Sequence, residues 1–376
     1  MKDVKEYLTQ KRSENEPLSG DWAFIADLYD KRLWHQLTLK LLEFVKNDHF
    51  TANGGLLELY ENFLYDFETK INPLSLMEII MSVIKEIQDP EKAIDFLNRQ
   101  KEKVKANNDA QVLCLTAIGN LKLSERNLKE TKEIIEEVNK LLENIDGITT
   151  VHARFYDLSS GYDKAAGSFN DYYRNALRFL GCIDVAELPA KEQQERAFNL
   201  ALAALLGSDI YNFGELLAHP ILDSIKASEH TWVVDLLFAF NSGNIPRFET
   251  MKPTWTKQPD LASHELLLRQ KITLLCLMEM AFNRPPNDRS LTFKEIATDA
   301  RIPLNEVELL VMKALSIGLI KGSINEVIKV VQISWVQPRV LDRKQISNMK
   351  DRLSEWCDKT KNTTYMVEDQ VPELLI

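Results

Sequence analysis

The sequence predicts a mainly α-helical protein: a right-handed helical-repeat solenoid, then a winged helix with a small β-sheet, then a C-terminal helix. Glycine and proline are each 13 of 376 residues, about 3.5%, below the usual roughly 7% and 5%, so few residues break helices. Apolar residues recur at helical spacing from residue 19 to residue 285. A short helical pattern and runs of β-branched residues follow, which favours a small mixed domain.

The first 165 residues read as successive pairs of helices. The first two apolar stripes are Leu33, Leu37, Leu41, Leu42 and Val45, then Leu56, Leu57, Tyr60, Phe63, Leu64 and Phe67. Asn72-Pro73 and Asp89-Pro90 each place a proline where a helix can begin. Units of roughly 30 to 40 residues are typical of tetratricopeptide-like solenoids. We therefore expect helical repeats over residues 1–165.

A second helical block is expected over residues 166–286. In the stretch HTWVVDLLFAFNSGNIPRF, Gly243 lies where a helix should end and Pro246 lies in the first turn of the next helix. The stretch ITLLCLMEM is apolar almost all round, which predicts burial on every side. Arg284-Pro285-Pro286-Asn287 ends the block. The remaining expected boundaries enclose residues 287–341 and residues 342–376.

Residues 291–325, LTFKEIATDARIPLNEVELLVMKALSIGLIKGSIN, predict a winged helix. Thr292 and Glu295 have the spacing of a capping box, so a helix should begin at Phe293 and end near Ala300. The next helix should bury Val307, Leu310, Val311, Ala314 and Leu315 and end at Gly318. The stretches GLIKGSIN and KVVQISWVQPRVL read as two strands.

The charges of this winged helix do not suit DNA. The chain has a net charge of 46 − 56 = −10, whereas phosphate neutralisation requires lysine and arginine. Asn305, Glu306 and Glu308 occupy the positions that would read bases. We therefore expect protein contact through an unpaired strand edge. The candidate interface residues of the strands are Ile320, Ile324, Val331, Ile333 and Trp335.

The stretch RKQISNMKDRLSEWCDKT predicts a helix with a narrow apolar seam. Ile346, Met349, Leu353 and Trp356 are spaced 3, 4 and 3 residues apart, as in helices that pack in bundles. Two readings are open: the helix folds back on its own winged helix, or its seam is an interface with partner helices.

No residue pattern predicts an enzyme. The phosphate loop GxxxxGK[ST] and the motifs GxGxxG, GxSxG and HExxH are absent. The six histidines are scattered: His35, His49, His152, His219, His230 and His264. We therefore expect no catalytic, cofactor-binding or metal-binding residues, although a site assembled from distant residues stays open.

Other sequence features favour an intracellular protein outside the membrane. The charged N-terminus MKDVKEYLTQKRSENEP is unlike a signal peptide, and no apolar run reaches the roughly 18 residues of a membrane span. Cys114, Cys182, Cys276 and Cys357 are far apart and without a CxxC pair, which indicates reduced thiols.

Several segments together resemble a known family. SFNDYYRNALRFLG, YNFGELLAHPILDSI, LLFAFNSGNIPRF and NEVELLVMKALSIGLIKGSIN are similar to the PCI domain, a helical-repeat and winged-helix module of the proteasome lid, the signalosome and a translation initiation factor. Six further segments resemble more specifically the PCI subunits of the 26S proteasome lid: KRLWHQLTLKLLEFV, LYENF, INPLSLMEII, VHARFYDLSS, RFLGCIDVAELPAKEQQERAF and WVQPRVLD. The resemblance covers essentially the whole chain, and is weakest in the first dozen residues and after Lys359.

The resemblance implies a non-catalytic scaffold of the regulatory-particle lid, acting in lid assembly and ubiquitin-dependent degradation in cytoplasm and nucleus. It implies contacts with other PCI subunits through sheet edges, with MPN-domain subunits including the deubiquitinase, and a shared bundle of C-terminal helices. The His-x-His pattern of that deubiquitinase family is missing. No nucleic acid, membrane or second copy of the chain is expected as a partner. The alternative is a PCI subunit of another assembly, with possible RNA contact.

Overall fold

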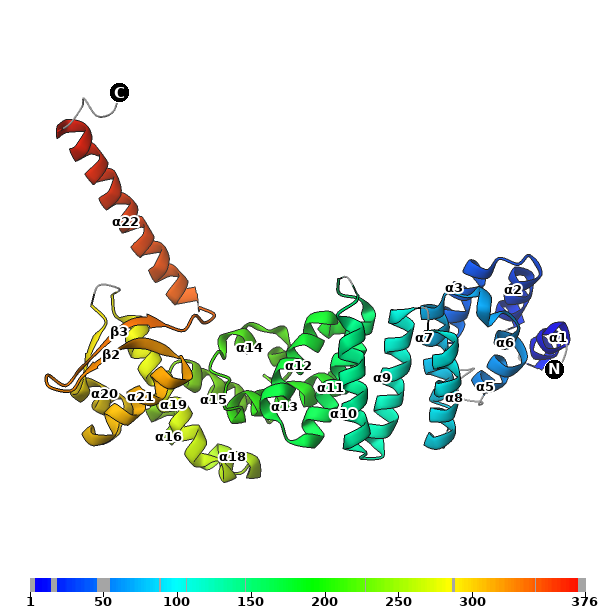
Figure 1. Ribbon diagram of the computed structural model, residues 1–376, viewed down its shortest axis with the longest axis horizontal. Helices are drawn as coiled ribbons and strands as arrows, with labels where there is room; N and C mark the ends of the chain where they lie inside the picture. Colours follow the sequence, from blue (N-terminus) through cyan, green and yellow to red (C-terminus); the bar gives the residue numbers. More distant parts are fainter. Residues whose placement is uncertain are drawn as a thin grey trace. The chain divides into compact units, whose positions relative to one another are not determined.

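The computed structural model describes residues 4–14, 19–45, 55–87, 89–105, 107–145, 147–226, 228–285, 288–341 and 343–370. The chain divides into two compact units, Met1–Asp184 and Val185–Ile376. Figure 1 shows that unit 1 is built of helices and that unit 2 adds a small sheet and a long last helix. The predicted mainly helical architecture is thus confirmed.

Unit 1 is a succession of helices joined by short connections. Its elements are α1 (Val4–Glu14), α2 (Ser19–Asp30), α3 (Trp34–Phe44), α5 (Gly55–Leu59), the π-helical turn η2 (Tyr60–Leu64), α6 (Tyr65–Phe67), the 3₁₀ turn η3 (Glu68–Lys70), α7 (Pro73–Ile84), α8 (Pro90–Lys103), α9 (Asn108–Ser124), α10 (Leu128–Leu142), α11 (Thr150–Ala166) and α12 (Phe169–Cys182). From α8 to α11 each helix packs against the next in chain order, and α7 packs against α9 (Figure 1).

Side-chain caps begin the helices of unit 1 where the sequence predicted. Asn72 accepts a hydrogen bond from the Leu74 amide at 3.0 Å, and Asp89 accepts one from the Glu91 amide at 3.2 Å. In both helices proline occupies the first turn, where its missing N–H is not needed.

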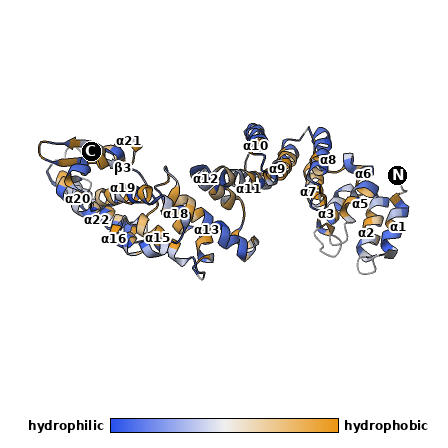
Figure 2. Ribbon diagram, turned by 90° about the horizontal axis from the view of Figure 1, so that it is seen from below, coloured by the Kyte–Doolittle hydropathy of each residue, from blue (hydrophilic) through white to orange (hydrophobic). Residues whose placement is uncertain are grey.

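The core of unit 1 contains most of the predicted stripes. Two members of these stripes, Leu33 and Leu57, lie at the surface. The buried members are Leu37, Leu41, Val45, Leu56, Tyr60, Phe63, Leu64 and Phe67. The rings of Trp22 and Phe44 pack edge to face with their centroids 5.0 Å apart, which is a favourable aromatic geometry. Helix α9 is buried along most of its length and α10 on one face only, and Figure 2 shows α9 mostly hydrophobic and α10 mostly hydrophilic.

One carboxyl group of unit 1 is buried without a cation. Asp163 on α11 accepts a hydrogen bond from the Asn175 side-chain amide of α12 at 2.8 Å. Burial raises the pKa of Asp163 to about 6, because a low-dielectric environment disfavours its charged form.

Unit 2 combines helices with a three-stranded sheet. Its elements are the 3₁₀ turn η4 (Val185–Glu187), α13 (Ala190–Leu206), α14 (Gly214–Ala218), the 3₁₀ turn η5 (Pro220–Ser224), α15 (Thr231–Asn241), α16 (Ile245–Thr250), α17 (Lys252–Trp255), α18 (Pro259–Ser263), α19 (Glu265–Asn283), β1 (Ser290–Thr292), α20 (Phe293–Ala300), the 3₁₀ turn η6 (Leu304–Glu306), α21 (Val307–Ile317), β2 (Ile320–Asn325), β3 (Val330–Val336) and α22 (Arg343–Gln370).

Helix α19 lies at the centre of unit 2. Every residue of its stretch from Lys271 to Met278 is buried, as the apolar pattern predicted, and α13, α15, α16, α18, α20, α21 and β3 pack around it. Gly243, at the end of α15, has a φ of +61°, and a Cβ there would lie 2.6 Å from the Cys276 Cα. Glycine is therefore required where α15 turns close to α19.

The one buried lysine of this helix joins α19 to α13. Lys271 Nζ donates hydrogen bonds to the carbonyl oxygens of Ala204, Leu205 and Gly207, at 2.7, 3.2 and 2.6 Å. It also lies 5.2 Å from the centre of the Phe213 ring. These carbonyls end α13 and have no intrahelical donor, so Lys271 satisfies them. Burial lowers the pKa of Lys271 to about 7.

The winged helix is confirmed, with one strand more than predicted. Thr292 and Glu295 form the capping box of α20, and Gly318 ends α21 with a φ of +80°. All strand pairs are antiparallel in the order β1-β3-β2, with Leu291 opposite Val331 and Ile324 opposite Val331 on the other side. Strand β1 was not predicted, because three residues are too few to show an alternating pattern.

Replacing Asp163 with asparagine should stabilise the chain at high pH. The pKa of Asp163 is raised in the folded state, so its charge penalises folding above about pH 6, and the penalty disappears below about pH 4. We expect Asp163→Asn to increase the free energy of unfolding by about 1–3 kcal/mol at pH 8 and by almost nothing at pH 4. Chemical denaturation at both pH values measures this, with the exposed Glu136→Gln as control. An equal gain at both would contradict it.

Replacing Lys271 with methionine should destabilise unit 2. The variant keeps the side-chain length but leaves three carbonyls of α13 without a donor, which we expect to cost about 2–4 kcal/mol in urea unfolding. Because the folded-state pKa of Lys271 is lowered, the wild type should gain stability relative to the variant from about pH 7 to about pH 9. A variant with unchanged stability would show that the clamp is dispensable.

Candidate interaction surfaces

The outer edge of β2 is the longest strand edge in the sheet. Strand β3 is paired on both sides, whereas no described strand pairs with the outer side of β2. Its ladder with β3 shifts register between Lys321 and Gly322, and a Cβ on Gly322 would meet the Gln332 carbonyl oxygen at 2.1 Å. The backbone of β2 can therefore accept a further strand, most regularly from Gly322 to Asn325.

The side chains predicted as strand contacts do not all face outward. Ile320, Val331 and Ile333 are buried in the core of the winged helix, so their side chains are not accessible in this chain. Ile324 and Trp335 are half-buried. The five residues therefore form a common surface only through the backbone of β2 and these two partly accessible side chains.

The turn between β2 and β3 carries exposed apolar residues that were not among the predicted interface residues. Val327 is 93% exposed and Ile328 is also exposed. The signal was available, because two β-branched residues in a turn between strands have no core to fill. Lysine or arginine at this wing tip would suit phosphate, whereas valine and isoleucine suit an apolar protein surface.

The outward face of α21 is also apolar. Leu309 and Met312 are exposed beside Glu306. Three cations of the winged helix form ion pairs: Arg301 with Glu249, Lys329 with Glu326 and Arg339 with Glu279. The surface that reads DNA in other winged helices presents leucine, methionine and a carboxylate beside the single lysine Lys313.

The C-terminal helix is longer than predicted, and its seam is uncovered. Helix α22 extends through Gln370, beyond the predicted helix, and every residue from Ile346 to Gln370 is exposed. Ile346, Met349 and Leu353 are each 53% exposed and Trp356 is 67% exposed. In the structure the seam therefore does not pack on the winged helix of the same chain, which was one of the two alternatives.

The segment that leads into α22 is anchored by a buried ion pair. Arg339 pairs with Glu279 of α19, donates to the Asn241 carbonyl oxygen at 3.2 Å and lies over the Phe282 ring. The next residue, Val340, approaches Gly214 so closely that a Cβ on Gly214 would lie 2.8 Å from the Val340 Cβ. We call residues 337–341 the strap, because they hold the start of α22 against the helices of unit 2.

The described residues contain no group of three or more His, Cys, Asp or Glu side chains placed to hold a metal ion. His219, which the sequence analysis assigned to a turn, caps η5 by accepting from the Ile221 amide at 3.2 Å. Within the same described ranges, no helix is both long enough and apolar enough to cross a bilayer.

Family profiles match three consecutive parts of the chain. The profile of the PSD13 N-terminal repeats covers residues 21–237, the PCI domain covers residues 248–335 and the Rpn9 C-terminal helix covers residues 339–370. The chain is 38% identical to 26S proteasome non-ATPase regulatory subunit 13 homolog B of Arabidopsis thaliana, over 98% of each chain. It belongs to the family of 26S proteasome non-ATPase regulatory subunit 13.

Other members of the regulatory subunit 13 family match at similar levels. The 26S proteasome non-ATPase regulatory subunit 13 of Dictyostelium discoideum is 36% identical over 98% of each chain. The 26S proteasome regulatory subunit RPN9 of Saccharomyces cerevisiae is 36% identical over 89% of this chain and 88% of its own. By contrast, eukaryotic translation initiation factor 3 subunit M of Emericella nidulans is 25% identical over 55% of this chain. The family resemblance inferred from the sequence is thus confirmed at the level of subunit 13.

Replacing Arg339 with methionine should release the strap. The variant leaves Glu279 without its partner in a largely buried position, which costs about 3–5 kcal/mol in comparable sites. We expect proteinase K to cut residues 337–341 at least about tenfold faster at low protease concentration. Lys329→Met, which breaks the exposed pair with Glu326, is the matched control and should not change cleavage of the strap. Equal cleavage in both variants would contradict an anchoring role.

Proposed function

We propose that this chain is a non-catalytic scaffold subunit of the lid of the 26S proteasome regulatory particle, acting in lid assembly and thereby in ubiquitin-dependent protein degradation. The observation that carries the proposal is the uncovered apolar seam of α22 in a chain that belongs, over almost its whole length, to the regulatory subunit 13 family. Proteins that act as scaffolds expose apolar surfaces that partners cover.

The energetics of α22 favour a helical bundle. Fully burying one large apolar side chain stabilises by about 1.5–3 kcal/mol, so covering the exposed parts of Ile346, Met349, Leu353 and Trp356 is worth on the order of 3–6 kcal/mol. Their spacing of 3, 4 and 3 residues is the spacing that interlocks with a neighbouring helix. A lone helix with such a seam is therefore suited to packing against the helices of partner subunits.

The winged helix offers a second contact. The free backbone of β2 from Gly322 to Asn325 can pair with a strand edge of a neighbouring PCI subunit, and the wing tip at Val327 and Ile328 would extend that contact with apolar area. Ile324 and Trp335 would lie at its border, whereas Ile320, Val331 and Ile333 would support the strand from below.

The proposal includes the remaining expectations from the sequence. The partners are PCI-domain lid subunits and MPN-domain subunits including the deubiquitinase, with no nucleic acid, membrane or second copy of this chain. The location is cytoplasmic and nuclear. The functional parts are residues 1–165, 166–286, 287–341 and 342–376. The absence of catalytic motifs from the sequence supports a role without catalysis.

The alternative is a PCI subunit of another assembly with RNA contact. The observation that favours it is the partial similarity to translation initiation factor 3 subunit M, which covers 55% of this chain. Salt-sensitive RNA binding by the purified chain would support this alternative.

Substituting the seam of α22 should impair incorporation without unfolding the chain. Leu353→Asp with Trp356→Ala changes only exposed side chains, so the thermal midpoint of the isolated protein should stay within about 2 °C of wild type. Recovery in intact regulatory particles, measured by affinity purification and quantitative mass spectrometry, should fall at least about tenfold, because the lost burial exceeds 1.4 kcal/mol.

The matched control places the same residue types on another face of α22. Asn362→Asp with Asn348→Ala makes the same change in charge at exposed positions away from the seam and should be incorporated normally. Recovery of the seam variant in particles at the wild-type level would overturn the proposed role of α22.

A further inference from the structure

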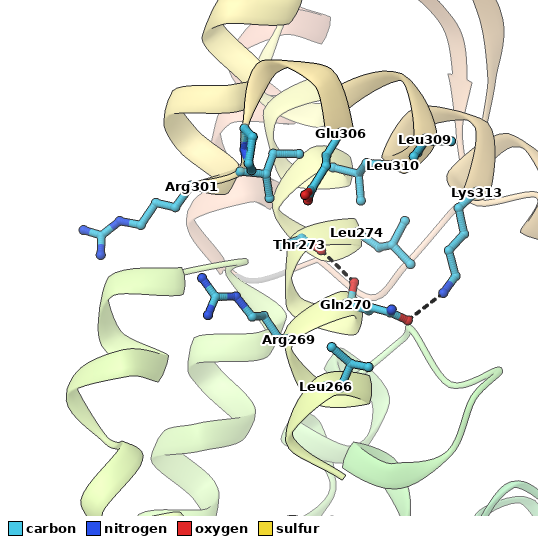
Figure 3. A pocket seen from close by; sticks show the side chains of 12 residues that line it. Leu266, Arg269, Gln270, Thr273, Leu274, Arg301, Glu306, Leu309, Leu310 and Lys313 are labelled. Carbon is cyan, nitrogen blue, oxygen red and sulfur yellow. Dashed lines mark hydrogen bonds between the residues drawn. The ribbon is translucent and has the colours of Figure 1, made fainter.

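A groove in unit 2 lies apart from both the β2 edge and the seam of α22. It has a volume of about 540 Å³ and is lined by α19, by the turn that follows α20 and by α21. Figure 3 shows Leu266 and Leu274 on the α19 side and Leu309 and Leu310 on the α21 side. We call it the α19–α21 groove.

Apolar residues form the floor of this groove and part of its rim. Leu274 is buried, whereas Leu266 is 73% exposed and Leu309 is 64% exposed. These two exposed leucines belong to different helices but line one concave surface. Apolar side chains that entered the groove would displace water from both leucines, which is favourable.

The polar rim of the groove is positively charged. Arg269, Arg301 and Lys313 line it together with the carboxylate of Glu306. Glu249 pairs with Arg301 and lies 3.9 Å from Arg269, so three cations face two carboxylates. The local balance is 3 − 2 = +1 on a chain whose net charge is −10.

Lys313 is the cation of this rim best placed to meet a partner. Its ammonium donates to the neutral Gln270 Oε1 at 2.8 Å, as Figure 3 shows. None of the carboxylates in the described ranges forms an ion pair with it within 4.0 Å. A carboxylate brought beside Lys313 would therefore make a charge-assisted hydrogen bond that the chain itself does not supply.

We propose that the α19–α21 groove binds an apolar helical segment of a partner protein, with a carboxylate of that segment against Lys313. Apolar residues of such a segment at positions i, i+3 or i+4, and i+7 would lie along Leu266, Leu274 and Leu309, as in helix-in-groove recognition. Glu306 and the small local charge disfavour a polyphosphate ligand. This inference rests on the proposed function in one respect: the partner is another protein of the assembled particle.

Amine labelling tests whether the groove is covered in the assembly. Acetic anhydride is reacted with the isolated full chain and with purified particles, and acetylation of Lys313 is measured by mass spectrometry. We expect labelling of Lys313 to be at least roughly fivefold lower in the particle, because the contact would exclude water. A zero-length carbodiimide cross-link should join Lys313 to an Asp or Glu within an apolar peptide of a partner. Lys313→Arg should abolish the cross-link but not incorporation.

Substitutions test whether the groove contributes to the binding. Leu309→Asp and Lys313→Glu alter exposed positions and should leave the isolated chain folded. In particles that have not been cross-linked, each substitution should lower retention of the partner identified by the cross-link at least roughly tenfold in salt washes. Lys226→Glu, the same charge reversal at another exposed lysine, is the control and should retain the partner.

Two failures are distinguishable. If the wild-type chain is incorporated but Lys313 is labelled equally in both states, the groove inference is overturned and the proposed function stands. If the chain never enters the particle, both are overturned. A cross-linked peptide without apolar residues would also overturn the inference.

Discussion

Helix α19 is surrounded by other elements of unit 2 and yet carries two charged side chains among them, Lys271 and Glu279. Each of these charges must have a partner within the fold. Lys271 meets the condition by donating to three carbonyls at the end of α13, and Glu279 meets it by pairing with Arg339 of the strap. Buried charges are tolerated only with such partners. The position of α13 and the start of α22 therefore both depend on α19.

The same helix connects the candidate surfaces. Its N-terminal half forms one wall of the α19–α21 groove, and its C-terminal half holds the strap from which α22 begins. The sheet packs on it through its central strand β3, and β2 is one of the two outer strands. Three surfaces with accessible apolar side chains thus have one buried support, which is the arrangement expected of a scaffold whose contacts must keep a fixed geometry.

Much of the fold could be predicted from local patterns. The capping box at Thr292, the prolines at the starts of α7 and α8 and the glycine at the end of α21 act within a few residues, so their effect is visible in the sequence. The strand contacts were predicted less well. Ile320, Val331 and Ile333 have the residue types of an interface and of a core alike, and only their packing shows that they are core.

Periodicity, capping and charge are properties of neighbouring residues, so the sequence alone predicts the helical repeats, the winged helix, the seam spacing of α22 and the poor match to a phosphate ligand. That the seam is uncovered and that Leu266 and Leu309 share a groove is visible only in the folded structure. The reason is physical: the two walls of the groove come from residues more than 40 positions apart, and no local sequence pattern reports which distant residues meet.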